Sequence, residues 1–316
     1  MSEAIVECVP NYSEGRDARQ VEAIVAAMQV EGVRLLDWSM DADHNRSVVT
    51  IAGSPAAVVE SAVRGAGKAA ELIDLTRQQG VHPRIGAADV IPFVPISGIK
   101  LEQCVLLARQ AGLEIWRRFG VPVYFYEAAA ARPDRANLEE VRRGQFEGLR
   151  DAVSKEPSRR PDLGGPGLHP TAGACAVGAR KFLIAYNLHF DGGDMAMVRA
   201  IAREVRAASG GLKGVKALGV MVQGRPQLTM NITDFTVTPI SQVFRMVAAL
   251  ARGYQAAPVE GEVIGLVPEA ACERESDWMR LLVGFDSETK IIERRLESPL
   301  SWPGENPVGE TRYDLV

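Results

Sequence analysis

Hydrophobic residues in the first part of the chain switch between the two periods that distinguish strands from helices. Short apolar runs rich in β-branched residues predict strands at 4–9, 33–38, 47–52, 90–96 and 121–126. Apolar residues at helical spacing predict helices at 21–28, 56–73 and 104–115. The order is β-α-β-β-α-β, then α-β. Pro92 and Pro95 indicate that strand 90–96 is an edge strand or irregular, because proline cannot donate to a sheet ladder.

The second part of the chain repeats this order. Strands are predicted at 182–188, 215–222, 227–232 and 263–267, with a hairpin turn at 224–226. The apolar face of one helix covers 198–205, and Gly210-Gly211 is the predicted stop signal for that helix. A second helix covers 240–251, with Thr238 as its N-cap and Pro239 as its first helical residue.

These elements predict an α/β (α+β) protein built from two tandem split β-α-β (ferredoxin-like) lobes. Each lobe is expected to have a mixed sheet with helices on one face, which leaves the other faces to frame a ligand cleft. Between the lobes, 137–153 predicts one charged amphipathic helix, and 157–178 is a Gly- and Pro-rich segment without periodicity. The expected boundaries are 1–178 for the first lobe, including the loop 157–178, 179–300 for the second, and 301–316 for a tail.

Composition excludes some classes of function. The 316 residues are 47% hydrophobic and carry a net charge of −4, so no basic patch for nucleic acid or for a membrane surface is indicated. The four cysteines have no C-x-x-C spacing, which argues against disulfide and zinc frameworks. The N-terminus does not resemble a signal peptide, so we expect a cytoplasmic protein.

The segment 81–89 (VHPRIGAAD) is the first candidate for chemistry. His82 lies in a predicted loop, and imidazole can take and give a proton near neutral pH. Arg84 is a candidate clamp for a carboxylate, and Asp89 a candidate to orient His82. The competing interpretation is a turn histidine with a structural arginine, and an aspartate that caps the next strand.

Two further segments offer polar or close-contact groups. In 43–46 (DHNR), Asn45 and Arg46 are candidates to bind a polar ligand, against the alternative of a polar loop. In 164–173 (GGPGLHPTAG), glycines permit close approach of backbone to a flat ligand. The chain lacks the Lys and Ser/Thr of a phosphate-binding loop here. Its four histidines lack metal-binding spacing, so no metal is expected.

Several segments, in this order, resemble the formiminotransferase family. They are VECVPNYSEGR at 6–16, HNRSV at 44–48, HPRIGAADVIPFVP at 82–95, GARKFLIAYN at 178–187, LTMNITDF at 228–235 and GLVP at 265–268. The resemblance covers nearly the whole chain. It implies two α/β lobes with a folate tunnel between them and a homodimer.

The same resemblance implies glutamate formimidoyltransferase activity, in which the formimino group of N-formimino-L-glutamate passes to N5 of tetrahydrofolate in histidine degradation and one-carbon metabolism. It assigns the general acid/base to His82. Substrate contacts are expected from these residues: Asn45, Arg46, Arg84, Gly164, Gly165, Gly167, His169, Thr171 and Gly173. Tetrahydrofolate is then a co-substrate without a metal, and any cyclodeaminase is a separate protein.

Other interpretations remain open from the sequence. A close alternative transfers a formyl group between glutamate and tetrahydrofolate, or handles 5-formyltetrahydrofolate, by the same tetrahedral chemistry. Alternatives of another class are a folate-binding module without turnover and a structural dimer of ferredoxin-like repeats. His82 argues against the former, and the glycine-rich segment against the latter.

Overall fold

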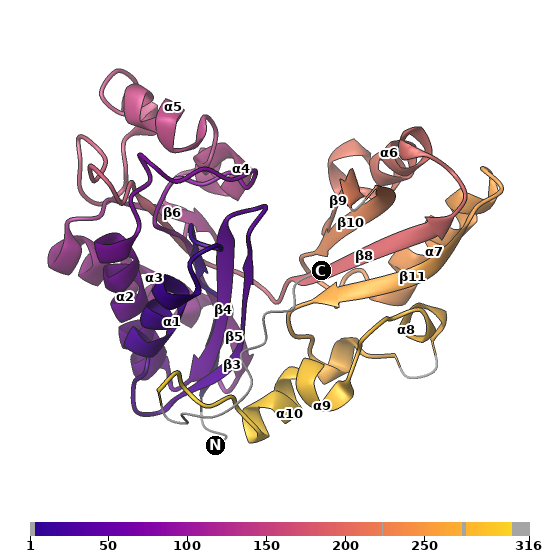
Figure 1. Cartoon of the computed structure of the whole chain (residues 1–316), viewed down its shortest axis with the longest axis horizontal. Helices are drawn as coiled ribbons and strands as arrows, with labels where there is room; N and C mark the ends of the chain where they lie inside the picture. The colour runs from indigo at the N-terminus through magenta and orange to yellow at the C-terminus, as the bar shows by residue number, and fades with distance from the viewer. Residues whose placement is uncertain (1–3, 223, 274–275, 305–316) are drawn as a thin grey trace. The chain divides into compact units, whose positions relative to one another are not determined.

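The computed structural model describes residues 4–222, 224–273 and 276–304 and divides into two compact units (Figure 1). The first unit is Met1–Arg180 together with the residues from Pro299 on, and the second is Lys181–Ser298. The predicted two-lobed α+β class is confirmed. Each unit is described by itself below.

The first unit contains a split β-α-β fold. Its elements are β1 (Ile5–Cys8), α1 (Ala18–Ala27), β3 (Val33–Asp41), β4 (Arg46–Gly53), α2 (Pro55–Leu72) and β5 (Ala88–Ser97). Strands β3, β4, β1 and β5 pair antiparallel in that order. The short strand β2 (Asn11–Tyr12) pairs with β4 and β5.

Two more strands extend this sheet in parallel. After α3 (Leu101–Phe119) the chain forms β6 (Val123–Glu127) and, much later, β7 (Cys175–Ala179), which inserts between β5 and β6. Strand β7 lies inside the segment that we expected to be irregular. It is buried on both faces, so its small residues show none of the alternation that identifies a half-buried strand.

Strand β5 is a central strand and not an edge strand, whereas its register shift agrees with the other predicted alternative, an irregular strand. It pairs with β1, β2 and β7. The carbonyl of Pro92 accepts a hydrogen bond from Val9 N at 3.3 Å, and Pro95 lies where the register between β1 and β5 shifts. A bulge is a position where a sheet tolerates proline, so Pro95 fits inside the sheet.

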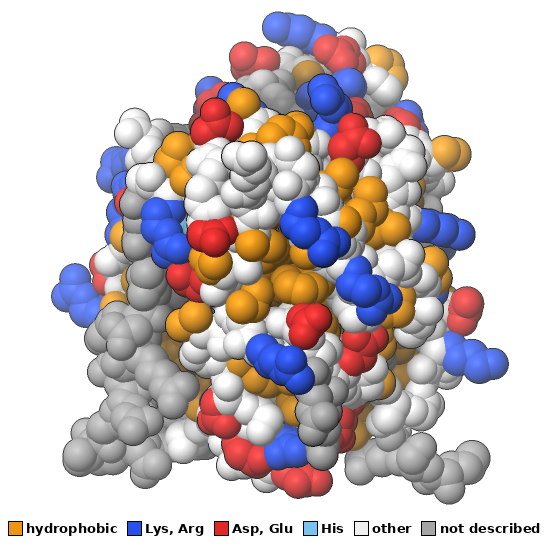
Figure 2. Space-filling view, turned by 90° about the vertical axis from the view of Figure 1, so that its right-hand side faces the viewer, with side chains coloured by type: hydrophobic (Ala, Val, Ile, Leu, Met, Phe, Trp, Pro, Cys, Tyr) orange, Lys and Arg blue, Asp and Glu red, His pale blue; other side chains and the backbone are white. Residues whose placement is uncertain are grey.

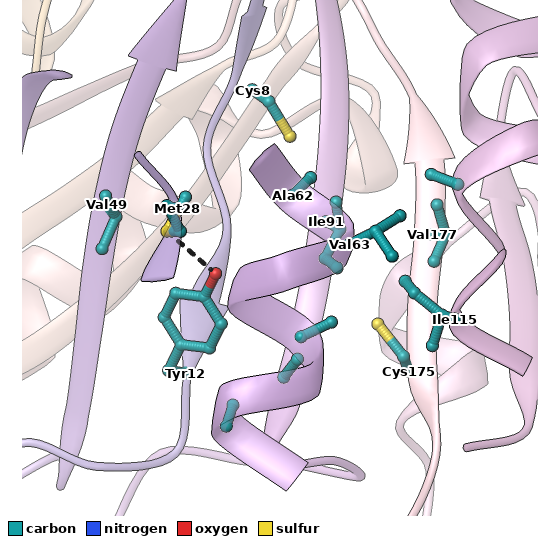
Figure 3. Close-up of a cluster of buried hydrophobic side chains, with 14 of the residues drawn as sticks. Cys8, Tyr12, Met28, Val49, Ala62, Val63, Ile91, Ile115, Cys175 and Val177 are labelled. Carbon is teal, nitrogen blue, oxygen red and sulfur yellow. Dashed lines mark hydrogen bonds between the residues drawn. The ribbon is translucent and has the colours of Figure 1, made fainter. Parts of the chain in front are cut away.

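Helices α1, α2 and α3 cover one face of this sheet and enclose the main core (Figure 1). The core joins side chains from the strands to the apolar stripes of the helices, including Ile91, Val63 and Ile115 (Figure 3). The Tyr12 hydroxyl donates to Met28 Sδ at 3.3 Å inside this core, which gives the buried phenol a partner (Figure 3).

The opposite face is covered only in part. Two short helices, α4 (Leu138–Val141) and α5 (Gln145–Ala152), pack near Tyr124 and Tyr126 of β6. The single helix predicted over 137–153 is therefore wrong. Gly144 has a φ of 83° and Gln145 a φ of 55°, and this left-handed backbone interrupts the helix.

The second unit is another split β-α-β fold. Its elements are β8 (Ile184–Asp191), α6 (Met195–Val205), β9 (Val215–Val222), β10 (Arg225–Ile232), α7 (Ile240–Arg252) and β11 (Ala257–Ile264). The sheet order is β11-β8-β10-β9 and all pairs are antiparallel, so the expectation of mixed sheets holds only for the first unit. Its last strand, β11, begins at Ala257, earlier than the strand predicted at 263–267.

Smaller elements complete the two units. Short helices of the second unit are α8 (Asp277–Arg280), α9 (Ser287–Lys290) and α10 (Ile292–Glu297). Single 3-10 turns are η1 (Pro133–Arg135), η2 (Pro157–Arg159), η3 (Ala207–Ser209) and η4 (Glu269–Ala271). The N-cap of α7 is Pro239 and not Thr238, whose hydroxyl donates to the Lys213 carbonyl at 2.6 Å.

Charges of both signs mix on the molecular face that Figure 2 shows. Lysine and arginine side chains alternate there with aspartate and glutamate around hydrophobic side chains. This face therefore lacks the single-sign field that would mark an electrostatic binding surface.

Residues 299–304 return to the first unit. Leu300 N donates to the Leu35 carbonyl at 2.8 Å, and Trp302 joins the main core with 8% of its surface exposed. The remainder of the expected tail 301–316, from 305 on, lies outside the described residues.

Candidate active site

His82 and Arg46 meet on the first unit. Arg46 begins β4, and His82 lies in the loop between α2 and β5. Arg46 Nη1 is 3.3 Å from His82 Nε2 and 3.5 Å from its Nδ1. A guanidinium can only donate, so the imidazole nitrogen that bonds it must be an acceptor. This contact therefore requires a neutral His82.

The electrostatic surroundings favour the same state. Burial lowers the pKa of His82 to about 2, with further lowering by Arg46, Arg142 and His44. Burial also lowers the pKa of Arg46, as does Arg142, while Asp89 and Asp41 oppose this shift. At neutral pH the imidazole is thus an uncharged proton acceptor beside two cations.

Asp89 acts on this site through Arg142. Its carboxylate forms an ion pair with Arg142, the residue at the end of α4, and accepts a hydrogen bond from Ile85 N at 2.7 Å. Sequence reasoning missed Arg142. Its polar position on a predicted helix was the only signal, and it lies 60 residues from His82 along the chain.

The side chain of Asn45 connects its own loop to those that contain Gly15 and Gln79. Its Oδ1 accepts from Gly15 N at 2.9 Å, and its Nδ2 donates to the Gln79 carbonyl at 2.9 Å. Its φ of 49° is left-handed, a conformation that asparagine tolerates better than most residues. It also lines a polar cavity of about 720 Å³ with Arg16 and Arg77.

Arg84 forms hydrogen bonds within the protein through the N–H groups of its guanidinium. It is 6% exposed and donates to both carboxylate oxygens of Glu147, at 2.8 and 3.0 Å. It also donates to the side chain and the carbonyl of Gln78, at 2.6 and 3.0 Å, and to Gln145 at 3.3 Å. This arginine therefore fastens α5 to the His82 loop, as expected for the structural alternative.

His44 lies next to this group. Its Nδ1 is 2.7 Å from Asp41 Oδ2, and its ring centroid is 6.3 Å from that of His82, edge to face. Burial opposes ionisation of Asp41, but hydrogen bonds from His44 outweigh it and lower the pKa of the carboxyl. Sequence reasoning quoted the DHNR segment and still missed this pair, because Asp41 lies outside that segment and beyond the strand predicted at 33–38.

The glycine-rich segment reaches the His82 loop at one end. Gly173 forms a bridge with Gly86, and Ala87 N donates to the Ala172 carbonyl at 2.9 Å. A Cβ at Gly173 would lie 2.2 Å from the Ile85 carbonyl oxygen, and its φ is 68°, so glycine is required there.

The rest of that segment contacts other elements. Gly164 packs on Trp116 of α3, and a Cβ at Gly167 would meet open space. His169 lines a shallow cavity of about 470 Å³ beside α2, and the Thr171 carbonyl accepts from Leu75 N at 2.9 Å. Gly165 precedes Pro166 with a φ of 103°. Among the contacts of described residues, none joins these five to His82.

Within the described ranges, no three His, Cys, Asp or Glu side chains gather in a metal-binding arrangement. Among the helices of those ranges, none has the length and apolar character needed to cross a membrane.

The sequence is similar to formiminotransferases along most of its length. Residues 5–180 match the family "Formiminotransferase domain, N-terminal subdomain", and residues 185–293 match "Formiminotransferase domain". A glutamate formimidoyltransferase of Thermoplasma acidophilum is 44% identical over 93% of this chain and 98% of its own.

Two other relatives extend this result. A glutamate formimidoyltransferase of Streptococcus pyogenes is 41% identical over 92% of this chain and 98% of its own. The formimidoyltransferase-cyclodeaminase of Gallus gallus is 40% identical over 84% of this chain but only 51% of its own. The chain therefore belongs to the formiminotransferase domain family.

Proposed function

We propose that this chain is a glutamate formimidoyltransferase, which transfers the formimino group of N-formimino-L-glutamate to N5 of tetrahydrofolate. The observation that carries the proposal is the neutral imidazole of His82 against Arg46, in a chain similar over 92–93% of its length to enzymes of that name. The proposed protein is a cytoplasmic homodimer.

The reaction needs a proton acceptor. N5 of tetrahydrofolate attacks the formimino carbon and gives a tetrahedral adduct, and the attacking nitrogen must then lose its proton. A neutral imidazole can accept it, a contribution of roughly 10²–10⁴-fold in rate. Burial and the nearby cations lower the pKa of His82, which favours the uncharged form that can accept a proton.

Arg46 and Arg142 supply positive charge for the substrates, which carry carboxylates. Arg46 lies against His82, and Arg142 has a buried Nε without a hydrogen-bond partner. Arg84 is not assigned this role, since its N–H groups are already used. The glycine-rich segment is assigned to tetrahydrofolate, which is a co-substrate, and no metal is invoked.

The test is formation of 5-formiminotetrahydrofolate by wild type, His82→Ala and the control His189→Gln. His189 lies on β8 of the second unit and contacts Gln227. We expect the His82→Ala variant to lose at least roughly a hundredfold in kcat while it unfolds at the wild-type temperature. The control variant should keep wild-type turnover.

Two outcomes would replace the proposal. Wild-type turnover of formylglutamate but not of formiminoglutamate would favour formyl transfer. Tight binding of tetrahydrofolate with no turnover of either donor would favour a binding module.

A further inference from the structure

We propose that His44, held by Asp41, is a second acid/base group of this site and gives a proton to the departing glutamate nitrogen. This inference rests on the proposed formimino transfer. It divides the two proton transfers of that reaction between two histidines instead of assigning both to His82.

His82 is poorly placed to be the proton donor. Its nitrogen accepts from Arg46 at 3.3 Å, and Arg142 adds a second cation nearby. An imidazolium formed there faces two guanidinium groups of the same sign, so it cannot persist as a reservoir of protons. The site therefore needs another group that can carry a proton in the resting state.

His44 has the environment that His82 lacks. The Asp41 carboxylate lies 2.7 Å from His44 Nδ1, and an adjacent carboxylate stabilises an imidazolium. This bond fixes the ring and leaves Nε2 as the nitrogen for a reactant. The side chain of His44 is 49% exposed, so it can regain protons from solvent.

The two rings are close enough to serve one reacting centre. Their centroids are 6.3 Å apart. Two hydrogen bonds of about 2.8 Å through one intervening atom span such a gap. The charged group in contact with His44 is Asp41. Arg46 and Arg142 act on the neighbouring His82, and Asp89 pairs with Arg142.

The proton transfers balance. The bond from N5 to the formimino carbon forms, and the N5 proton goes to His82. The bond from that carbon to the glutamate nitrogen then breaks, and the nitrogen takes the proton of His44. Transfer from His82 to His44 through a water molecule restores both groups. Asp41 is a positioning residue, because it acts only through His44.

The experiment compares His44→Gln and Asp41→Asn with the matched control Asp43→Asn, which removes the same charge from the same turn. For His44→Gln we expect kcat to fall roughly 10²-fold or more while KM for both substrates changes by less than about threefold. The limb of the pH–rate profile that reports a required acid should disappear in that variant. Asp41→Asn should shift this limb, and Asp43→Asn should leave kcat and the profile as in wild type.

The outcomes separate this inference from the proposed function. An active wild type and an inactive His82→Ala, together with a His44→Gln variant of wild-type kcat and pH profile, would overturn the role of His44 alone. A change confined to KM would also overturn it, as a binding role. Recovery of His44→Gly activity by added imidazole would support it. A wild type that forms no 5-formiminotetrahydrofolate would instead contradict the proposed function.

Discussion

Two arginines of the candidate site differ in what occupies their N–H groups. Arg84 donates to Glu147, Gln78 and Gln145. Among the described residues, the side chain of Arg46 makes its hydrogen-bonding contacts with His82, and we propose that its other N–H groups bind a substrate. We therefore propose that the same residue type serves structure at Arg84 and chemistry at Arg46.

Substitution by glutamine separates these roles. We expect Arg84→Gln to lower the free energy of unfolding by about 1–3 kcal/mol, because the buried bridge to α5 is lost; the exposed Glu147 limits the cost. Arg46→Gln should instead lower kcat/KM roughly tenfold or more and change stability little. Urea unfolding and steady-state kinetics of both variants test this. Equal effects of Arg84→Gln and Arg46→Gln on kcat/KM would contradict the assignment of structure to Arg84 and chemistry to Arg46.

Glu7 gives a pH dependence of stability. Burial raises the pKa of this β1 carboxyl to about 7, although Arg180 opposes the shift. The folded state then binds more protons than the unfolded state between about pH 4.5 and 7, so wild-type stability falls as pH rises through that range. Glu7→Gln removes the titration and should gain about 1–3 kcal/mol relative to wild type between pH 5 and pH 8.

Urea unfolding at both pH values measures this difference. Glu102→Gln, on the exposed side of α3, changes the same charge at the surface and should give no such trend. The same stability difference for Glu7→Gln at pH 5 and pH 8 would show that the carboxyl does not titrate in this range.

Candidate site residues could be proposed from the sequence where they stand together in a short segment. His82, Asn45 and Arg46 stand in segments with recognisable chemistry, and the structure brings Arg46 to His82. Arg142 was not predictable, because its place beside His82 depends on the turn at Gly144 and on the pair with Asp89. Partners distant along the chain are set by tertiary structure and leave no local pattern.

At the scale of elements, hydrophobic periodicity located most helices and strands. It failed for β7, whose residues are buried on both faces, and for the helix break at Gly144. Both errors lie between the two repeated units, where residues 133–179 contain short elements and long loops. Burial on both faces removes alternation, and one left-handed residue interrupts an otherwise helical pattern.

The contact between Gly86 and Ala174 shows how closely the segments that precede β5 and β7 approach each other. A Cβ at Gly86 would lie 2.0 Å from the Ala174 carbonyl oxygen, whereas one at Gly167 would meet nothing. We expect Gly86→Ala to cost about 1–3 kcal/mol or more and Gly167→Ala to be nearly neutral. Thermal unfolding of both variants tests the comparison. A neutral Gly86→Ala would mean that the two segments can separate without penalty.

At the scale of the whole molecule, two units share one topology but differ in how they are completed. The repeated β-α-β-β-α-β order was visible in the sequence. The return of the chain to the first unit was not, because a proline-rich segment with one tryptophan has no periodicity. The first unit is thus assembled from both ends of the described chain, and no single cut separates the two units.

This arrangement predicts that two tryptophans stabilise different units. Trp302 is 8% exposed in the first core, and Trp278 is fully buried in the second against Tyr186, with ring centroids 5.7 Å apart. Truncation of a large buried side chain costs about 3–5 kcal/mol, and somewhat less at a chain end. Trp302→Ala should therefore accelerate amide hydrogen exchange by at least about tenfold in β3 and β4, while β8 and β10 keep wild-type rates. Trp278→Ala should give the reverse pattern. Uniform acceleration in either variant would show that the two units unfold as one, and no change in β3 would show that the segment after Ser298 does not stabilise the first unit.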